Sequence, residues 1–194
     1  MIKLVIIFIS YSNLTFSQQI KEETLHFQNE LNTFYLNPKT TPLSNEELKD
    51  FKGLSFYPYN ENMIVNATLE RLKDQTAFQM PTTGSKQPMY KRYGILYFEI
   101  SGKKMQLEVY QNLELMNKPG FEKHLFLPFL DNTNGVETYG GGRYLDIEIP
   151  EGNKIVLNFN KAYHPYCTYT LGYSCPITPE VNFLETSIKA GVRL

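Results

Sequence analysis

Residues 95–110 read ILYFEISGKKMQLEVY, two runs of strand-forming side chains separated by SGKK at 101–104. Aliphatic and aromatic residues favour strands, and a glycine-containing turn between two such runs predicts a β-hairpin. Residues 144–149 and 154–159 form a second such pair, joined by PEGN at 150–153. The sequence therefore predicts two hairpins of an antiparallel sheet.

Further strands are predicted on either side of the first hairpin. Residues 63–70 alternate in the manner of a half-buried strand, residues 78–80 and 89–93 flank a turn, and 125–130 form another apolar run. Many short strands with Gly- and Pro-marked turns are typical of a sandwich or barrel. We expect a mostly-β fold: an antiparallel β-sandwich or barrel-like domain with an N-terminal helix and short flanking helices.

Three helices are predicted outside the sheet. Apolar residues recur at helical spacing over 19–36, and Asn37-Pro38 ends that run. Ser44 and Glu47 have the spacing of a capping box that starts a second helix. Residues 182–190 are expected to form a last short helix that ends at Gly191.

The composition fits one domain of balanced charge. The chain has 194 residues, 42% of them hydrophobic, with 19 Lys and Arg against 20 Asp and Glu. There is no basic excess to neutralise phosphates, which argues against a nucleic-acid partner and against adhesion to an anionic membrane. We expect residues 18–194 to form a single mostly-β domain.

Residues 1–17 have the pattern of a cleavable secretory signal peptide. Lys3 is followed by the apolar run LVIIFI at 4–9, and Thr15 and Ser17 place small side chains three and one positions before Gln18. A buried N-terminal strand is the alternative. The apolar run is too short for a transmembrane helix, which needs about 20 residues. We expect a secreted or periplasmic protein with no transmembrane segment.

Two long loops, 131–143 and 160–176, hold the candidate binding site. Gly140-Gly141-Gly142 permits close approach to the backbone, and Arg143 offers a planar fork for a carboxylate or phosphate. Because the predicted second hairpin would bring Arg143 near Asn160, we expect a polar pocket for a small anionic or polar ligand. Its candidate residues are Arg143, Tyr139, Glu137, Asp131, Asn160 and Tyr163. For Arg143 itself the structural interpretation is favoured, a glycine-rich bulge with Arg143 paired to Glu137, Asp131 or Asp146, because loop arginines are usually satisfied within the protein.

Cys167 and Cys175 are the only cysteines in the chain. In an exported protein a disulfide between them is the leading interpretation, and two reduced, buried thiols come next. A metal site with His164 or a Cys–His nucleophile is the remaining alternative. The spacing matches no closed zinc pattern, and no cofactor fingerprint is present, so we expect neither a metal nor a cofactor.

Six tyrosines crowd the same region, and they suit either a pocket lining or a small satellite core beneath the loops. They are Tyr139, Tyr144, Tyr163, Tyr166, Tyr169 and Tyr173. Asp131, Glu137 and Asp146 could include a general acid–base pair.

The segments FLPFLDNTNGVETYGGGRYLD (126–146), FNKAYHPYC (159–167) and YSCPITPEVNFL (173–184) resemble the bacterial domain of unknown function 1684 family. The resemblance is most specific over 125–191 and can be traced back through the first helix. It implies a mostly-β domain and no defined activity. His164 stands where the family has Asn, Val181 where it has Glu, and Val192 where an acid often follows, so a role that requires an imidazole is weakened.

Three functions remain open from the sequence. The leading one is an envelope domain that binds a ligand in a small polar pocket around Arg143 or has a structural role. The first alternative is a hydrolase-type enzyme that uses Asp131, Glu137 or Asp146 with a tyrosine or His164. The second alternative is a protein–protein interaction domain whose loop aromatics bury against a partner.

Overall fold

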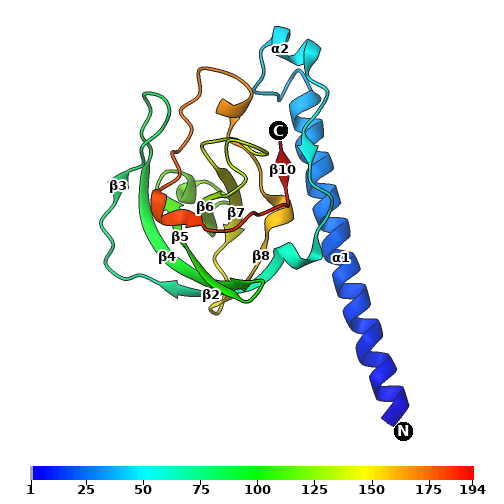
Figure 1. Ribbon diagram of the computed structural model, residues 1–194. Helices are drawn as coiled ribbons and strands as arrows, with labels where there is room; N and C mark the ends of the chain where they lie inside the picture. Colours follow the sequence, from blue (N-terminus) through cyan, green and yellow to red (C-terminus); the bar gives the residue numbers. More distant parts are fainter. Residues whose placement is uncertain (1) are drawn as a thin grey trace.

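The structure is a computed structural model that describes residues 2–194, with side chains described from Phe16 onward. Helix α1 spans Ile2–Leu36 and helix α2 spans Asn45–Asp50 (Figure 1). The predicted capping box is present: the Ser44 hydroxyl accepts from the Glu47 N–H, and the Glu47 carboxylate accepts from the Ser44 N–H. Short 3₁₀ helices lie in the loops at Glu61–Met63 (η1), Leu115–Asn117 (η2), Phe159–Lys161 (η3), Tyr166–Thr168 (η4) and Glu180–Asn182 (η5).

A curled antiparallel sheet forms a half-barrel, which confirms the predicted fold class (Figure 1). Its strands follow the order β7-β6-β5-β4-β2-β8. They are β2 (Ile64–Arg71), β4 (Met89–Ile100), β5 (Lys103–Asn112), β6 (His124–Asp131), β7 (Arg143–Glu148) and β8 (Lys154–Asn158). Two short strands extend this sheet: β3 (Phe78–Gln79) pairs with β4, and β9 (Phe183–Leu184) pairs with β6. Strands β1 (Ser55–Phe56) and β10 (Val192–Arg193) form a separate two-stranded sheet.

The first predicted hairpin is confirmed as β4–β5. Ile100 lies opposite Lys103, so the turn consists of Ser101 and Gly102, which both have positive φ. A β-bulge between Arg92 and Gly94 shifts the alternation of side chains along β4. The beginning and the end of this strand therefore contribute to different hydrophobic clusters.

The second predicted hairpin is wrong. Strand β7 pairs with β6 and strand β8 pairs with β2, so the two lie at opposite ends of the strand order. Five residues, 149–153, separate them and cross between the two edges of the curled sheet. Arg71 donates to the carbonyls of Pro150 and Gly152, at 2.7 Å each, and holds this crossing in place.

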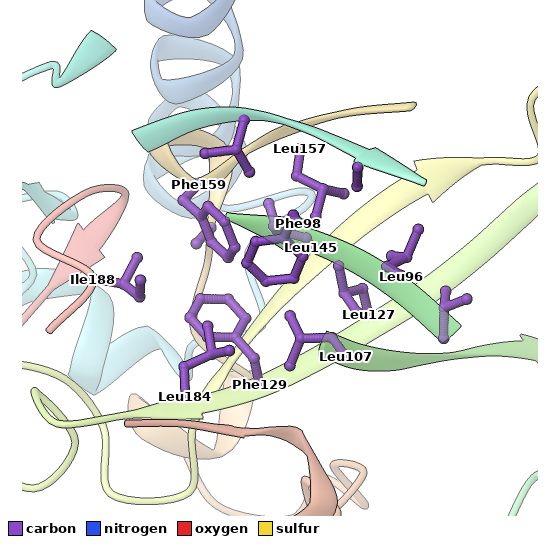
Figure 2. Packing of buried hydrophobic residues seen from close by; sticks show 14 of the residues in the cluster. Leu96, Phe98, Leu107, Leu127, Phe129, Leu145, Leu157, Phe159, Leu184 and Ile188 are labelled. Atoms are coloured by element: carbon purple, nitrogen blue, oxygen red, sulfur yellow. The ribbon is translucent and has the colours of Figure 1, made fainter. Parts of the chain in front are cut away.

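The main hydrophobic core fills the inside of the curl (Figure 2). Alternate residues of neighbouring strands, such as Leu107, Leu127 and Leu145, point into it and are fully or almost fully buried. Phe129 and Phe159 meet edge-to-face there, with ring centroids 5.3 Å apart.

The predicted C-terminal helix over 182–190 is also wrong. Asn182 ends a 3₁₀ turn, and β9 then pairs in parallel with β6. The residues between β9 and β10 form neither a helix nor a strand, and Ile188, Ala190 and Val192 are fully buried in the core. Helical hydrogen bonds are replaced here by contacts with the rest of the fold, so tertiary structure overrides the local helix signals.

Arg143 holds this C-terminal segment through hydrogen bonds to its carbonyl oxygens. Its guanidinium donates to Ala190 O at 2.5 Å, Ile188 O at 2.7 Å and Val192 O at 3.3 Å. It also forms an ion pair with Asp131 at 2.6 Å, in which both side chains are 0% exposed. The pair fastens the C-terminal segment across the open side of the half-barrel.

His164 connects the two long loops. One ring nitrogen accepts from the backbone N–H of Tyr139 at 3.1 Å, and the other lies 2.8 Å from the Tyr169 hydroxyl. Burial, assisted by the charge of Arg143, lowers the pKa of His164 from 6.5 to about 3. His164 is therefore neutral in the folded protein over the whole ordinary pH range.

Helix α1 packs beside the end of β8 and the η3 turn (Figure 1). Thr24 accepts from the Asn158 amide at 2.7 Å, and Gln28 donates to Asn160 O at 2.9 Å. The helix ends at Leu36, as predicted, and begins at Ile2 instead of residue 19.

The predicted signal segment 1–17 lies almost wholly outside the residues whose side chains are described. In the described part of the chain, no helix is long and apolar enough to cross a bilayer.

The first prediction concerns the ion pair. Asp131→Asn leaves the Arg143 charge buried without its partner, which costs about 3–5 kcal/mol. We expect the melting temperature to fall by on the order of 10 °C, measured by circular dichroism. Lys189→Ala is the control, because it removes the exposed Lys189–Glu137 pair from the same segment and should change the melting temperature little. Equal effects of the two substitutions would contradict the role given to the buried pair.

The second prediction concerns pH. Below about pH 6.5 the unfolded chain binds a proton at His164 that the folded chain does not, so stability falls as pH falls, by up to about 1.4 kcal/mol per pH unit. His164→Asn keeps an acceptor and a donor but cannot titrate. Its denaturation midpoint should fall less than that of the wild type between about pH 7 and about pH 5. The exposed His26→Asn variant should keep the wild-type profile, and a wild-type profile in His164→Asn would refute this assignment.

Candidate functional site

A cleft of about 540 Å³ lies on the face of the sheet that is turned away from the main core. Its floor is the second hydrophobic cluster, in which Tyr90, Phe126 and Tyr144 are buried. Its walls come from α1, from the segment before β6 and from the loop after η3. The described lining residues are Phe27, Leu31, Tyr35, Tyr90, Leu115, Phe121, His124, Phe126, Tyr144, Asp146, Tyr163, His164, Pro165, Tyr166, Tyr173, Ser174, Cys175 and Pro176. We call it the aromatic cleft.

The alternation of side chains along β6 and β7 determines which residues form the floor of the aromatic cleft. His124 and Phe126 on β6 have the opposite orientation to Leu125 and Leu127, which face the main core. Tyr144 and Asp146 on β7 likewise alternate with Leu145. The Phe126 and Tyr144 rings meet edge-to-face with centroids 4.7 Å apart, so the floor is tightly packed.

The loop after η3 is bound to β7 through its backbone. Tyr163 and Tyr144 exchange N–H···O bonds of 2.9 and 3.0 Å, like two residues of neighbouring strands. The Tyr144 hydroxyl also donates to the carbonyl of Pro176 at the other end of the loop. Both ends of the loop are thus fixed to the strand that carries Asp146.

A disulfide closes the same loop over the cleft. Cys167 and Cys175 are joined, with their Cα atoms 6.3 Å apart, and Cys175 borders the cleft. Tyr173 lies within the closed segment, and its ring meets that of Tyr166, the residue before Cys167, edge-to-face at 5.0 Å. The bond limits the movement of two aromatic walls, and both sulfurs are used by it, which leaves no thiolate for a metal or a nucleophile.

Asp146 is the polar centre of the cleft. One carboxylate oxygen lies 2.9 Å from His124 Nε2, and the other accepts from the Tyr163 hydroxyl at 2.8 Å. The Asp146 side chain is 48% exposed, whereas that of His124 is 18% exposed. The other ring nitrogen of His124, Nδ1, is buried without a hydrogen-bond partner in the described structure. Asp146 therefore keeps free acceptor capacity on the solvent side.

The tyrosines around Asp146 stay protonated. Burial, as the main cause, raises the pKa of Tyr163, Tyr90 and Tyr166, and the negative charge of Asp146 raises it further in each. Their hydroxyls act as neutral hydrogen-bonding groups, and the carboxylate lies close enough to act on all three.

The expected pocket around Arg143 is not formed. The Arg143 side chain is 0% exposed, and its partners are Asp131 and backbone carbonyls. Gly142 has φ +94°, and a Cβ there would lie 2.6 Å from Phe129 O, so the glycine serves a tight turn beside the core. This placement matches the structural alternative, a bulge with Arg143 paired to Asp131.

Glu137 and Tyr139 lie apart from the cleft. Glu137 pairs with Lys189 at 2.8 Å and accepts from the Tyr57 hydroxyl at 3.2 Å. Tyr139 supplies the backbone N–H that holds His164. Both serve contacts between loops.

The Asn160 side chain is buried and binds the backbone of Asn60. It accepts from the Asn60 N–H at 2.8 Å and donates to the Asn60 carbonyl at 2.9 Å, with 1% of its surface exposed. Of the six candidate pocket residues, Tyr163 alone borders the aromatic cleft. The error follows from the wrong hairpin, because Arg143 and Asn160 were brought together only by pairing β7 with β8.

From the sequence, Asp146 is only one of three acidic residues that could form an acid–base pair, and His124, Phe126 and Tyr90 are not predicted as site residues. The available signal was strand alternation. Around Leu125 and Leu145, alternate residues face the core, and the intervening positions hold His124, Phe126, Tyr144 and Asp146. Polar and aromatic side chains on the second face of a strand indicate that this face is not plain solvent-exposed surface.

The comparisons with known proteins agree with the fold. A solution NMR structure of an uncharacterised protein from Haloarcula marismortui has a TM-score of 0.71 and 29% sequence identity, covering 95% of this chain and 97% of that chain. No curated protein matches the sequence. Residues 49–193 match the family described as "Protein of unknown function (DUF1684)", which includes the whole sheet, the disulfide loop and Asp146. The chain belongs to this DUF1684 family.

Proposed function

We propose that the protein binds a small organic molecule in the aromatic cleft. The observation that carries the proposal is a half-exposed carboxylate, Asp146, at the centre of walls made of aromatic side chains. Ligand sites have volumes of about 300–1,000 Å³, largely apolar walls and a few convergent polar groups. The cleft, at about 540 Å³, fits each of these properties.

Binding is favoured over hydrolysis by the placement of the carboxylates. Asp131 is fully buried against Arg143, and Glu137 is engaged by Lys189 on another part of the surface. Asp146 is the one Asp or Glu among the described residues that line the cleft. A pair of carboxylates on the two sides of a substrate, as glycoside hydrolysis needs, is therefore not supported there.

The cleft also has rigid walls and an accessible rim. The disulfide and the Tyr144–Tyr163 bridge fix the loop wall, while Phe121 and Tyr173 at the rim are 43% and 39% exposed. A preformed apolar site loses little conformational entropy on binding. These features support a receptor for a small ligand more than a flat contact with a protein partner.

The third prediction tests this proposal with 2-phenylethanol as a probe, titrated by calorimetry and by NMR of the aromatic side chains. Leu31→Trp places a larger side chain in the cleft and should abolish binding. Leu25→Trp is the matched control, because Leu25 is 46% exposed on the same helix outside the cleft lining, and it should bind like the wild type. Binding that is unchanged in Leu31→Trp, or no binding to the wild type, would contradict the proposed site.

We further propose that the protein is exported and that residues 1–17 are removed. The order of Lys3, the apolar run 4–9 and the small residues before Gln18 supports export. The Cys167–Cys175 pair supports it as well, because disulfides persist in oxidising compartments.

The fourth prediction concerns the exported material. Its intact mass should correspond to a chain that begins at or near Gln18, and thiol titration of the unfolded, unreduced protein should find no free thiol. Reduction should then expose two. A full-length soluble chain with two free thiols would argue against both export and the bond.

A further inference from the structure

The charges in the aromatic cleft have one sign. Among the described residues that line it, nine are Phe or Tyr, one is Asp, and Lys and Arg are absent. Nothing in this lining would neutralise an anionic ligand except a protonated histidine. The cleft therefore differs from the anion site that Arg143 suggested.

The contacts of Asp146 leave its carboxylate able to accept further hydrogen bonds. His124 and Tyr163 engage different oxygens of Asp146, so both oxygens act as acceptors. An ionised carboxylate has about four acceptor positions, and these two contacts use two of them. Because the Asp146 side chain is 48% exposed, the remaining positions are open to a donor from the ligand.

The aromatic rings around Asp146 also favour a positively charged ligand. The faces of Phe and Tyr rings carry negative electrostatic potential and attract ammonium groups. Tyr90, Tyr163 and Tyr166 are near enough to Asp146 for its charge to act on their hydroxyls, and burial keeps those hydroxyls neutral. A cation at Asp146 would thus lie between a carboxylate and uncharged aromatic side chains.

We infer that the ligand is a small organic ammonium compound, whose cationic head binds Asp146 and whose apolar body packs against the aromatic walls. This inference rests on the proposed ligand-binding function and specifies its ligand class. Asp146 provides the charge, while His124 and Tyr163 fix its orientation.

The fifth prediction compares three probes of similar size: 2-phenylethylamine, 2-phenylethanol and 3-phenylpropionate. The amine should bind the wild type about tenfold or more tightly than the alcohol, and the acid should bind weakest. Asp146→Asn should remove the advantage of the amine over the alcohol, because the amide that replaces the carboxylate carries no charge. Glu148→Gln is the matched control, because it removes an exposed carboxylate of the same strand outside the cleft lining and should keep the wild-type order.

A second measurement does not depend on the fold of a variant. In the wild type, the amine affinity should fall from low to high ionic strength, while the alcohol affinity should not. Equal affinities for all three probes, with binding still lost in Leu31→Trp, would overturn the cationic ligand and leave the proposed binding site standing. If none of the three binds the wild type, the proposed function fails as well.

Discussion

The buried ion pair between Asp131 and Arg143 is the constraint on which the rest of the structure depends. Two charged groups with 0% exposure are stable only when their hydrogen-bonding capacity is largely used, and here the guanidinium is shared among a carboxylate and three backbone carbonyls. Asp131 in turn accepts from the Thr133 N–H at 2.7 Å. One pair thereby fixes the end of β6, the start of β7 and the C-terminal segment.

This arrangement divides the molecule into two faces with different tasks. The inner face of the curled sheet is closed by the C-terminal segment and holds the main apolar core. The opposite face of β6 and β7 carries aromatic side chains and Asp146, and it is only partly covered by α1 and the disulfide loop. A rigid core behind the cleft, together with the contacts to His124 and Tyr163, gives Asp146 a fixed position.

The long loops have roles opposite to those expected from their composition. Arg143, Asn160 and His164 look like ligand-binding groups, yet each is buried and bonded to other parts of the chain. They satisfy backbone groups of other segments that would otherwise be left unpaired: Arg143 binds the C-terminal segment, Asn160 binds Asn60 and His164 binds Tyr139. The group that remains half-exposed, Asp146, comes from a strand.

The sequence by itself determined the secondary structure where local chemistry is strong. The Ser101-Gly102 turn and the alternation around it specified the β4–β5 hairpin, and Ser44 with Glu47 specified the start of α2. Tertiary structure alone decided which partners β7 and β8 take, because a five-residue connection can either form a hairpin or cross between the edges of a curled sheet. It also decided that 182–190 does not form a helix, because carbonyls of this segment bind a buried arginine distant in sequence. The cleft forms only when β7 and β8 take these partners. The sequence therefore contains the residues of the cleft, but it does not show that they lie together.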